Sequence, residues 1–412
     1  MPKSEKKYGL LFQFILIIPI LNVVSSLATP FFPGALNPGV IRGIVLTLFL
    51  FWYLLVVYQK HSLTIPTIVF VFYLFILCWF SSEPLTSLYI YNKVIITSLL
   101  FIVSFQTFNS LEKFNFLLRV IVIALFFQEL YFLFSNLTGI GKGSYMDDSV
   151  LFGETGVNMT KAMVVFVLTI PTFLRIEENR RWKLLAFILL LVGILIVILG
   201  MKRSAILAMM FGFLTYVVFT PFKSRVLQFL PIALVIIILT SPFYFPIIEK
   251  RFQSRQERVS MTYNQLQESE SEGRMLEVKF TVEDALEEGA ARLFFGFDLF
   301  LKKDFNGHKR MLHVDYMNML GGAGLVGLGL FLYLYYKIGW FIWLVRQKVK
   351  QNNLINELSA MGFSLIAVQA FLSIGGTMQG VNLRGYILFI LGAIVSILLL
   401  LLKNQFASDG DK

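Results

Sequence analysis

The chain has 412 residues, of which 57% are hydrophobic and 15% are charged, and its formal net charge is +11. This composition excludes the soluble globular classes and is typical of polytopic membrane proteins. The cations lie mainly in short loops, so they indicate membrane topology and no binding of nucleic acid. The only cysteine, Cys78, lies in an apolar segment, and an intramolecular disulfide is therefore excluded.

Apolar segments follow one another along the whole chain and predict about twelve transmembrane helices of about 20 residues each. In chain order we expect them over residues 9–28, 40–58, 63–80, 88–108, 114–136, 158–174, 183–200, 203–219, 226–247, 314–345, 358–376 and 383–402. No linker or repeat divides the chain. The sequence therefore predicts an all-α integral membrane protein with a single polytopic domain over residues 1–412.

Lys and Arg are distributed unequally between the loops on the two sides of the membrane. The N-terminal tail, every second loop and the C-terminal tail carry them, whereas the opposite short loops are nearly free of them. Because cytoplasmic loops are enriched in Lys and Arg, both termini are predicted to be cytoplasmic. Lys202 and Arg203 break this pattern at the tip of an outer hairpin. Either they extend to lipid phosphates, or they form an anion site that opens to the outer leaflet.

The longest loop, residues 249–312, lies between the ninth and tenth predicted spans and is expected to form an extracytoplasmic cap. Within it the apolar residues recur at helical spacing, which predicts an amphipathic helix on the membrane face; they are Met275, Val278, Val282, Ala285 and Leu286.

Two motif-like patterns carry no chemistry. The string "GAGLVG" matches a dinucleotide fingerprint, but it lies in a predicted span with no strand before it. We expect Gly324 and Gly327 to allow close packing instead. The three histidines show no metal-ligand spacing with the single cysteine, so neither a metal site nor a cofactor is expected.

Three segments, in order along the chain, carry a family resemblance. They are "GMKRSAILAMMFG" with Arg203, "SEGRMLEVKFTVED" with Arg274, and "LHVDYMNMLGGAGLVGLGLF" with His313. This series resembles the bacterial O-antigen ligase / O-antigen polymerase family over roughly residues 150–345. In that family the His is followed by a Tyr and, further on, by two Gly, a spacing that is kept here by Tyr316, Gly324 and Gly327.

The stretch "GETGVNMTKAM", with Asn158, is similar to the family's entry to an outer span. There are also departures. Val314 stands where an Asn is usual, Lys202 replaces a Ser, and Asp298 occupies a position that is commonly Gly. These differences concern the geometry for the acceptor more than the class of reaction.

The resemblance implies a GT-C-like, metal-independent membrane glycosyltransferase at the outer face of the bacterial cytoplasmic (inner) membrane. Its donor would be a glycan on a polyprenyl diphosphate such as undecaprenyl diphosphate, and its acceptor another glycan or a lipid. Membrane lipids would surround it, and a flippase and a chain-length regulator would be its partners. The function expected first is polymerisation of lipid-linked repeat units into O-antigen, capsular or exopolysaccharide. The alternative is a ligase that transfers glycan to lipid A core or another acceptor.

A rival from another class is a lipid-glycan flippase or transporter. About twelve spans fit that reading. A transporter made of two halves usually has its longest loop in the cytoplasm between the halves, whereas here the longest loop is predicted to be external and late in the chain.

The predicted site residues fit the chemistry of transfer from a diphosphate. Arg203 and Arg274 are expected to bind the diphosphate, because a guanidinium stays charged and binds phosphate oxygens in a fork. His313 precedes a helix, where the imidazole stays neutral, and it is predicted to act as the general base. The alternative for His313 is an interfacial residue that caps a span.

Eight further polar residues are candidates for lining the site. Asp315 could orient the His313 ring or simply begin a helix. Glu129 lies in the outer part of a span, where an ionisable group indicates function. The whole set is Lys202, Asp315, Tyr316, Glu129, Asn158, Lys161, Arg42 and Arg384.

Overall fold

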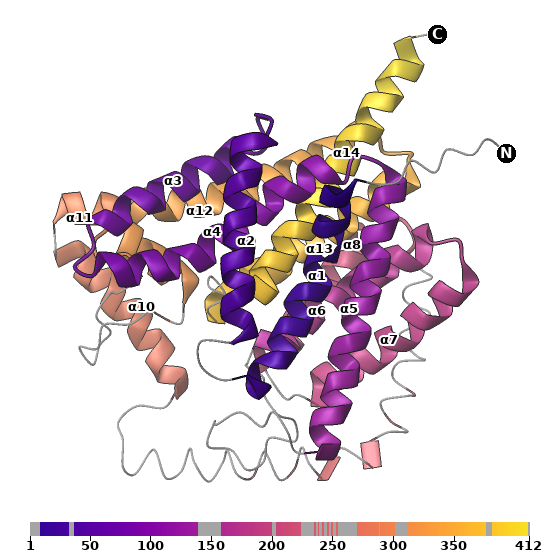
Figure 1. Ribbon diagram of the computed structural model, residues 1–412, viewed down its shortest axis with the longest axis horizontal. Helices are drawn as coiled ribbons and strands as arrows, with labels where there is room; N and C mark the ends of the chain where they lie inside the picture. Colours follow the sequence, from indigo (N-terminus) through magenta and orange to yellow (C-terminus); the bar gives the residue numbers. More distant parts are fainter. Residues whose placement is uncertain are drawn as a thin grey trace.

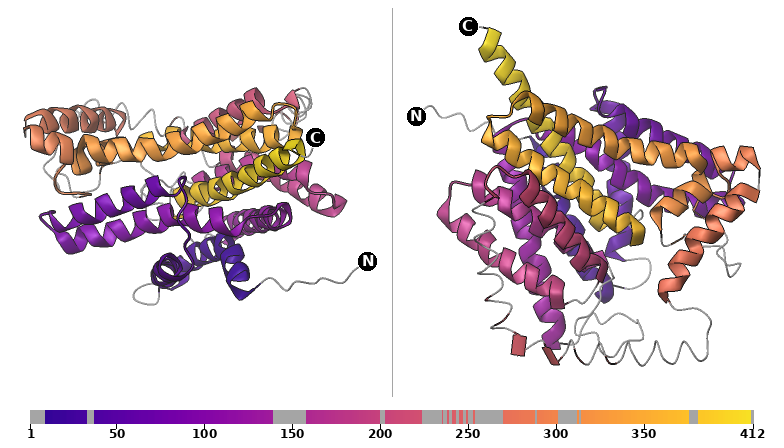
Figure 2. Two further views of the ribbon diagram at one scale, coloured as in Figure 1. Left: turned by 90° about the horizontal axis from the view of Figure 1, so that it is seen from above. Right: turned by 180° about the vertical axis from the view of Figure 1, so that it is seen from behind.

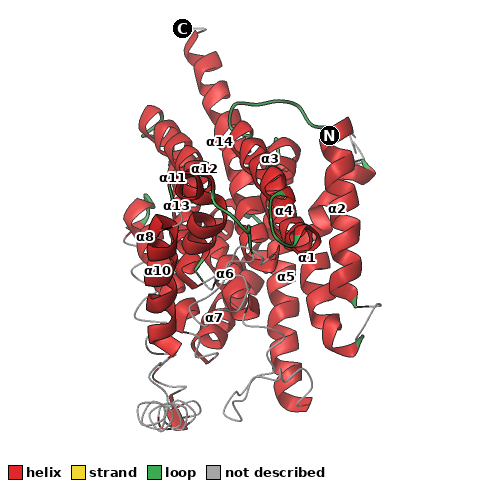
Figure 3. Cartoon of the chain, turned by 90° about the vertical axis from the view of Figure 1, so that its left-hand side faces the viewer, coloured by secondary structure: helices red, strands yellow, loops and turns green. Residues whose placement is uncertain are grey.

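The computed structural model describes residues 9–32, 37–138, 158–199, 203–223, 270–287, 289–300, 312, 314–375 and 381–410, with a few isolated positions between 235 and 253. All regular structure in these ranges is helical (Figure 3). The all-α prediction is therefore confirmed for the described part of the chain.

The helices follow the predicted spans closely. They are α1 Leu10–Ala28, η1 Thr29–Phe31, α2 Pro38–Val56, α3 Ile65–Trp79, α4 Pro84–Thr107, α5 Leu111–Thr138, α6 Asn158–Ile176, α7 Arg180–Leu199, α8 Arg203–Phe219, α10 Glu270–Glu287, α11 Ala290–Phe295, α12 Asp315–Lys348, α13 Asn353–Leu372, η3 Ser373–Gly375, η4 Val381–Gly385 and α14 Tyr386–Gly410. Proline in the first turn begins α2, α3 and α4, where its missing N–H costs no hydrogen bond.

Eight of the described helices are long and apolar enough to cross a membrane, judged by length and composition, and α3 and most of α8 form shorter apolar helices. The ninth predicted span, 226–247, lies largely outside the described residues, as does about half of the loop 249–312. The count of twelve spans and the large external loop therefore stay predictions.

The helices form two groups with different inclinations. In Figure 1, α3, α4 and the long part of α12 run across the view, whereas α1, α2 and α5 run up and down it. Figure 2 shows the same groups from above and behind. Helix α14 joins the groups by packing closely along α4, and α13 packs along α8. At Gly392 the helices α4 and α14 approach so closely that a Cβ would overlap Ser104.

Helix α12 is not the single continuous span that the sequence predicted for 314–345. Gly324 has φ 66° and ψ −171°, a conformation that only glycine adopts readily, and it breaks the helix. The residues before the break fold back, so that the ring of Tyr316 lies 6.1 Å from the ring of Phe331. In a straight helix, fifteen residues would separate them by about 22 Å. We call residues 315–323 the half-helix.

The break depends on contact with α11. A Cβ on Gly324 would lie 2.6 Å from the backbone nitrogen of Gly296, and it would overlap the backbone of Phe294 more severely. The hydroxyl of Tyr73, from α3, donates to the carbonyls of Phe295 and Ala323 at 3.1 and 2.8 Å. The expectation of close packing at Gly324 is thus confirmed, although the partner is a short cap helix and not another span.

The loop after α11 fixes the cap to the α3–α4 hairpin. Asp298 has φ 54°, which Asp tolerates better than most residues. Its Oδ1 accepts a hydrogen bond from the backbone N–H of Ser82 at 2.6 Å, and Ser87 Oγ donates to the carbonyl of Leu299 at 2.9 Å. Asp298 therefore adopts the backbone conformation that a glycine at this position would adopt, and it adds a hydrogen bond.

The predicted cap helix is present as α10, and its buried face includes polar residues beside one residue of the predicted apolar set. Glu277, Thr281 and Ala285 are buried at successive turns, and α10 packs against α12. Val282 and Leu286 are exposed. Of the apolar residues that gave the helical pattern, Ala285 is therefore buried, whereas Val282 and Leu286 are not.

Candidate functional site

The three residues predicted to carry the chemistry are only partly described. Arg203 begins α8 and Arg274 lies in α10, but their side chains lie outside the described residues, as do Lys202 and His313. Asn158 begins α6, and its side chain is likewise outside. The roles of these residues in binding and catalysis stay predictions.

The residues on both sides of His313 are held firmly. Asn318 binds the backbone of Leu312 twice, since its Oδ1 accepts from the N–H and its Nδ2 donates to the carbonyl, both at 2.7 Å. Val314 is buried and extended, and its carbonyl accepts from the backbone N–H groups of Met317 and Asn318. The half-helix begins at Asp315, so the prediction that His313 precedes a helix is confirmed.

A buried polar cluster lies at the start of the half-helix. Asp315 is fully buried and is close enough to Tyr335 to interact electrostatically with its phenol. The Tyr335 hydroxyl accepts a hydrogen bond from Arg384 Nε at 3.1 Å. Tyr316 donates its hydroxyl hydrogen to the carbonyl of Ala370 at 2.8 Å. We call Asp315, Tyr335 and Arg384 the arginine cluster.

The cluster unites segments that are far apart in the sequence. Asp315 comes from the half-helix, Tyr335 from the long part of α12, and Arg384 from the π-helical turn η4 before α14. Two of the sequence-predicted candidates, Asp315 and Arg384, meet here, and a third, Tyr316, is the next residue on the half-helix. Sequence reasoning missed Tyr335 and Asn318, although both lie in the predicted span 314–345.

Two other candidates are placed differently. Arg42 holds α2 to α1, because its Nη1 donates to the Asn22 carbonyl and to the hydroxyls of Ser25 and Ser26 at 3.1, 2.9 and 3.0 Å. Glu129 is buried in α5 opposite Gly193 of α7, where an added Cβ would lie 3.0 Å from its Oε1. Lys161, in α6, is also buried. These placements favour a structural role for Arg42 in particular.

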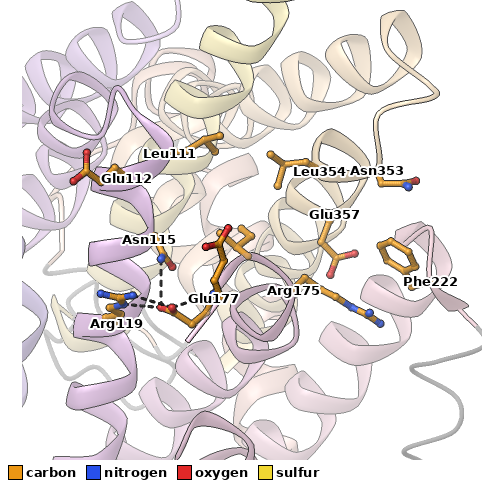
Figure 4. Close-up of a pocket in the computed structure, with 12 residues that line it drawn as sticks. Leu111, Glu112, Asn115, Arg119, Arg175, Glu177, Phe222, Asn353, Leu354 and Glu357 are labelled. Atoms are coloured by element: carbon orange, nitrogen blue, oxygen red, sulfur yellow. Dashed lines mark hydrogen bonds and ion pairs between the residues drawn. The ribbon is translucent and has the colours of Figure 1, made fainter. Parts of the chain in front are cut away.

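A separate, open pocket of about 650 Å³ lies at the predicted cytoplasmic end of the bundle (Figure 4). Arg119 binds Glu177 through both carboxylate oxygens, with Nε–Oε2 and Nη2–Oε1 distances of 2.6 and 2.8 Å. This guanidinium, with other hydrogen bonds, lowers the pKa of Glu177 to about 2. Glu357 accepts hydrogen bonds from Tyr216 and Thr220.

The charged side chains that line the pocket make their contacts with other residues of the protein. Glu177 and Glu357 are buried and hydrogen-bonded, and the guanidinium of Arg175 lies over the Phe222 ring with its carbon 4.5 Å from the ring centroid. We therefore regard this pocket as a structural junction of α5, α6, α8 and α13. The sequence held a signal for it, because Arg119 is a charge within an apolar span and such a charge needs a partner.

No group of three or more His, Cys, Asp or Glu residues that could hold a metal ion occurs in the described part of the chain. No protein-family model matches the chain, and no curated protein sequence matches it. The family resemblance therefore depends on the residues that carry it, above all on the spacing from His313 to Gly327.

Proposed function

We propose that this chain is an integral-membrane glycosyltransferase of the O-antigen polymerase type. It joins oligosaccharide repeat units, carried on undecaprenyl diphosphate, into O-antigen, capsular or exopolysaccharide. The reaction takes place at the outer face of the bacterial cytoplasmic membrane, and both termini lie in the cytoplasm. A flippase that delivers the lipid-linked unit and a chain-length regulator are the expected partners.

The half-helix is the observation that carries this proposal. It begins directly after the His313–Val314 pair and folds back into the bundle. Tyr335 lies between its first residue, Asp315, and a buried cation, Arg384. Asn318 fixes the backbone immediately before His313. A base must be held in a set geometry to act on a bound substrate, and this arrangement supplies such support.

The proposed reaction is a displacement at the anomeric carbon of the donor sugar. The acceptor hydroxyl attacks this carbon, the bond to the diphosphate breaks, and polyprenyl diphosphate leaves. His313 accepts the hydroxyl proton, since the N-terminal end of a helix keeps its ring neutral. Arg203 and Arg274 bind the leaving diphosphate, whose negative charge rises as the bond breaks.

Deletion of the gene, followed by gel analysis of surface glycan, tests the proposal. A polymerase is supported when long chains disappear while single repeat units stay attached to their acceptor. Loss of all attached glycan, with finished polymer accumulating on the lipid carrier, would instead indicate the ligase. Lipid-linked single units that accumulate on the cytoplasmic leaflet would indicate a flippase and contradict the enzyme assignment.

A further inference from the structure

Arg384 is a buried cation whose hydrogen-bonding capacity is mostly unused. Its side chain is fully buried, and Nε donates to the Tyr335 hydroxyl, but neither Nη1 nor Nη2 has a hydrogen-bond partner among the residues that the structure describes. A buried charge that lacks such partners is strongly unfavourable, so its presence calls for an explanation.

The surroundings stabilise the charge of Arg384 without using its N–H groups. The guanidinium carbon lies 5.1 Å from the Phe331 ring centroid and 5.7 Å from that of Phe70. Aromatic faces attract a cation, but they do not satisfy the in-plane N–H groups. The π-helical turn that carries Arg384 is itself a rare conformation that is frequent at functional sites.

Other arginines of the bundle show that this state is not general. Arg346, at the other end of α12, donates through Nη1 to the carbonyl of Phe219 at 2.6 Å. Arg119 binds the Glu177 carboxylate through two nitrogens. Arg384 differs from both because its two terminal nitrogens are free at the place where the half-helix begins.

We propose that Arg384 and Tyr335 bind phosphate oxygens of the lipid-linked donor inside the bundle. Two parallel N–H groups of a guanidinium match two oxygens of a phosphate, and the Tyr335 hydroxyl adds a third donor. Tyr335 is half-buried, whereas Arg384 is fully buried beside it. This inference rests on the proposed function, because that function supplies a donor that always carries a diphosphate.

Binding is measured with purified full-length protein and farnesyl diphosphate, a short-chain analogue of the donor lipid. Thermal unfolding is followed as the ligand is added, after equilibration. The wild type should be stabilised by the ligand. Arg384→Lys keeps the charge but loses the fork, so the dissociation constant should rise about 10-fold or more. Arg384→Met should weaken the stabilisation further, leaving at most the part that Arg203 and Arg274 supply.

The apo protein gives a second, independent readout. Because Met removes an unpaired buried charge and keeps an apolar stem, Arg384→Met should have an unfolding midpoint equal to or above that of the wild type. Arg346→Met is the matched control. This substitution removes the hydrogen bond from Arg346 to the Phe219 carbonyl, so it should lower the unfolding midpoint of the apo protein. The shift caused by farnesyl diphosphate should stay unchanged.

Two results would overturn the inference: an unchanged farnesyl diphosphate shift in Arg384→Met, or a clearly lower midpoint of that apo variant. Thermal unfolding with inorganic pyrophosphate or with glucuronate shows whether the site recognises a phosphate or a sugar carboxylate. Stabilisation by pyrophosphate supports a phosphate site, whereas stabilisation by glucuronate alone would contradict it. The two proposals can fail separately. If the wild type transfers glycan but Arg384→Met binds the diphosphate as well as the wild type does, only this inference is refuted. If the wild type binds the diphosphate through Arg384 but transfers no glycan, only the proposed function is refuted.

Discussion

Replacement of Gly324 by alanine should be far more harmful than the same replacement at Gly329, five residues later on α12. At Gly324 the backbone has φ 66° and ψ −171°, and an alanine held there costs about 1–3 kcal/mol in strain. The new methyl group would also overlap the backbone of Phe294, and such overpacking costs a further 1–3 kcal/mol, roughly. We expect a total loss of about 3–4 kcal/mol.

Gly329 is the matched control because it lies in the same helix and receives the same methyl group. No atom lies within 4 Å of a Cβ added there, and its backbone is helical. Alanine favours a helix over glycine by about 0.5–1 kcal/mol, so Gly329→Ala should be neutral or stabilising. The assay is thermal unfolding of both purified variants in detergent, followed by tryptophan fluorescence, with glycan transfer measured alongside.

The comparison tests whether the half-helix is held in place by the Gly324 break. Gly324→Ala should unfold many degrees below the wild type and should lose transfer even at temperatures where it stays folded. Equal unfolding midpoints for the two alanine variants would show that residue 324 is an ordinary helical position. The folded-back half-helix would then be refuted, together with the placement of Asp315 beside Tyr335.

Three further predictions concern separate parts of the molecule. Asn318→Leu leaves the buried N–H and C=O of Leu312 without partners, so it should lower the free energy of unfolding by about 2–3 kcal/mol and reduce glycan transfer. A variant with the stability and the transfer rate of the wild type would contradict this. The Glu177 pKa is lowered from 4.5 to about 2, so the stability from its ion pair is complete above pH 4.5 and is lost as the pH falls towards 2. Glu177→Gln should remove that part of the acid sensitivity of the unfolding midpoint, and an unchanged pH profile would refute the assignment. A cysteine at position 271, in a protein without Cys78, should react with an impermeant thiol reagent added from outside, and labelling only in opened membranes would reverse the topology.

The sequence predicted the helices well because a bilayer demands long apolar segments with internally satisfied backbones. The predicted starts of α2, α3 and α4 differ from the observed ones by two to four residues, although a proline in the first turn of each helix was a local signal for them. Such predictions depend on neighbours in the sequence. This is why Arg42 and Arg384 looked alike, as cations that begin a span.

Tertiary contacts separate those two arginines. Arg42 meets Ser25 and Ser26 of α1, whereas Arg384 lies between aromatic rings from α3 and α12. The break at Gly324 likewise depends on the backbone of Phe294, thirty residues earlier, and Arg119 finds its partner fifty-eight residues along the chain. Local sequence patterns carry no information on which distant segment of the chain will pack against a given residue.

The central claim is that His313 acts as the base of a glycan transfer, and purified enzyme with a lipid-linked donor tests it most directly. His313→Ala should lower the rate of chain formation by roughly 10²–10⁴-fold, while binding of the donor diphosphate changes little. His308→Ala, in the same polar segment, should keep the wild-type rate. If the His313→Ala enzyme forms chains as fast as the wild type, the base assignment and the proposed mechanism are contradicted.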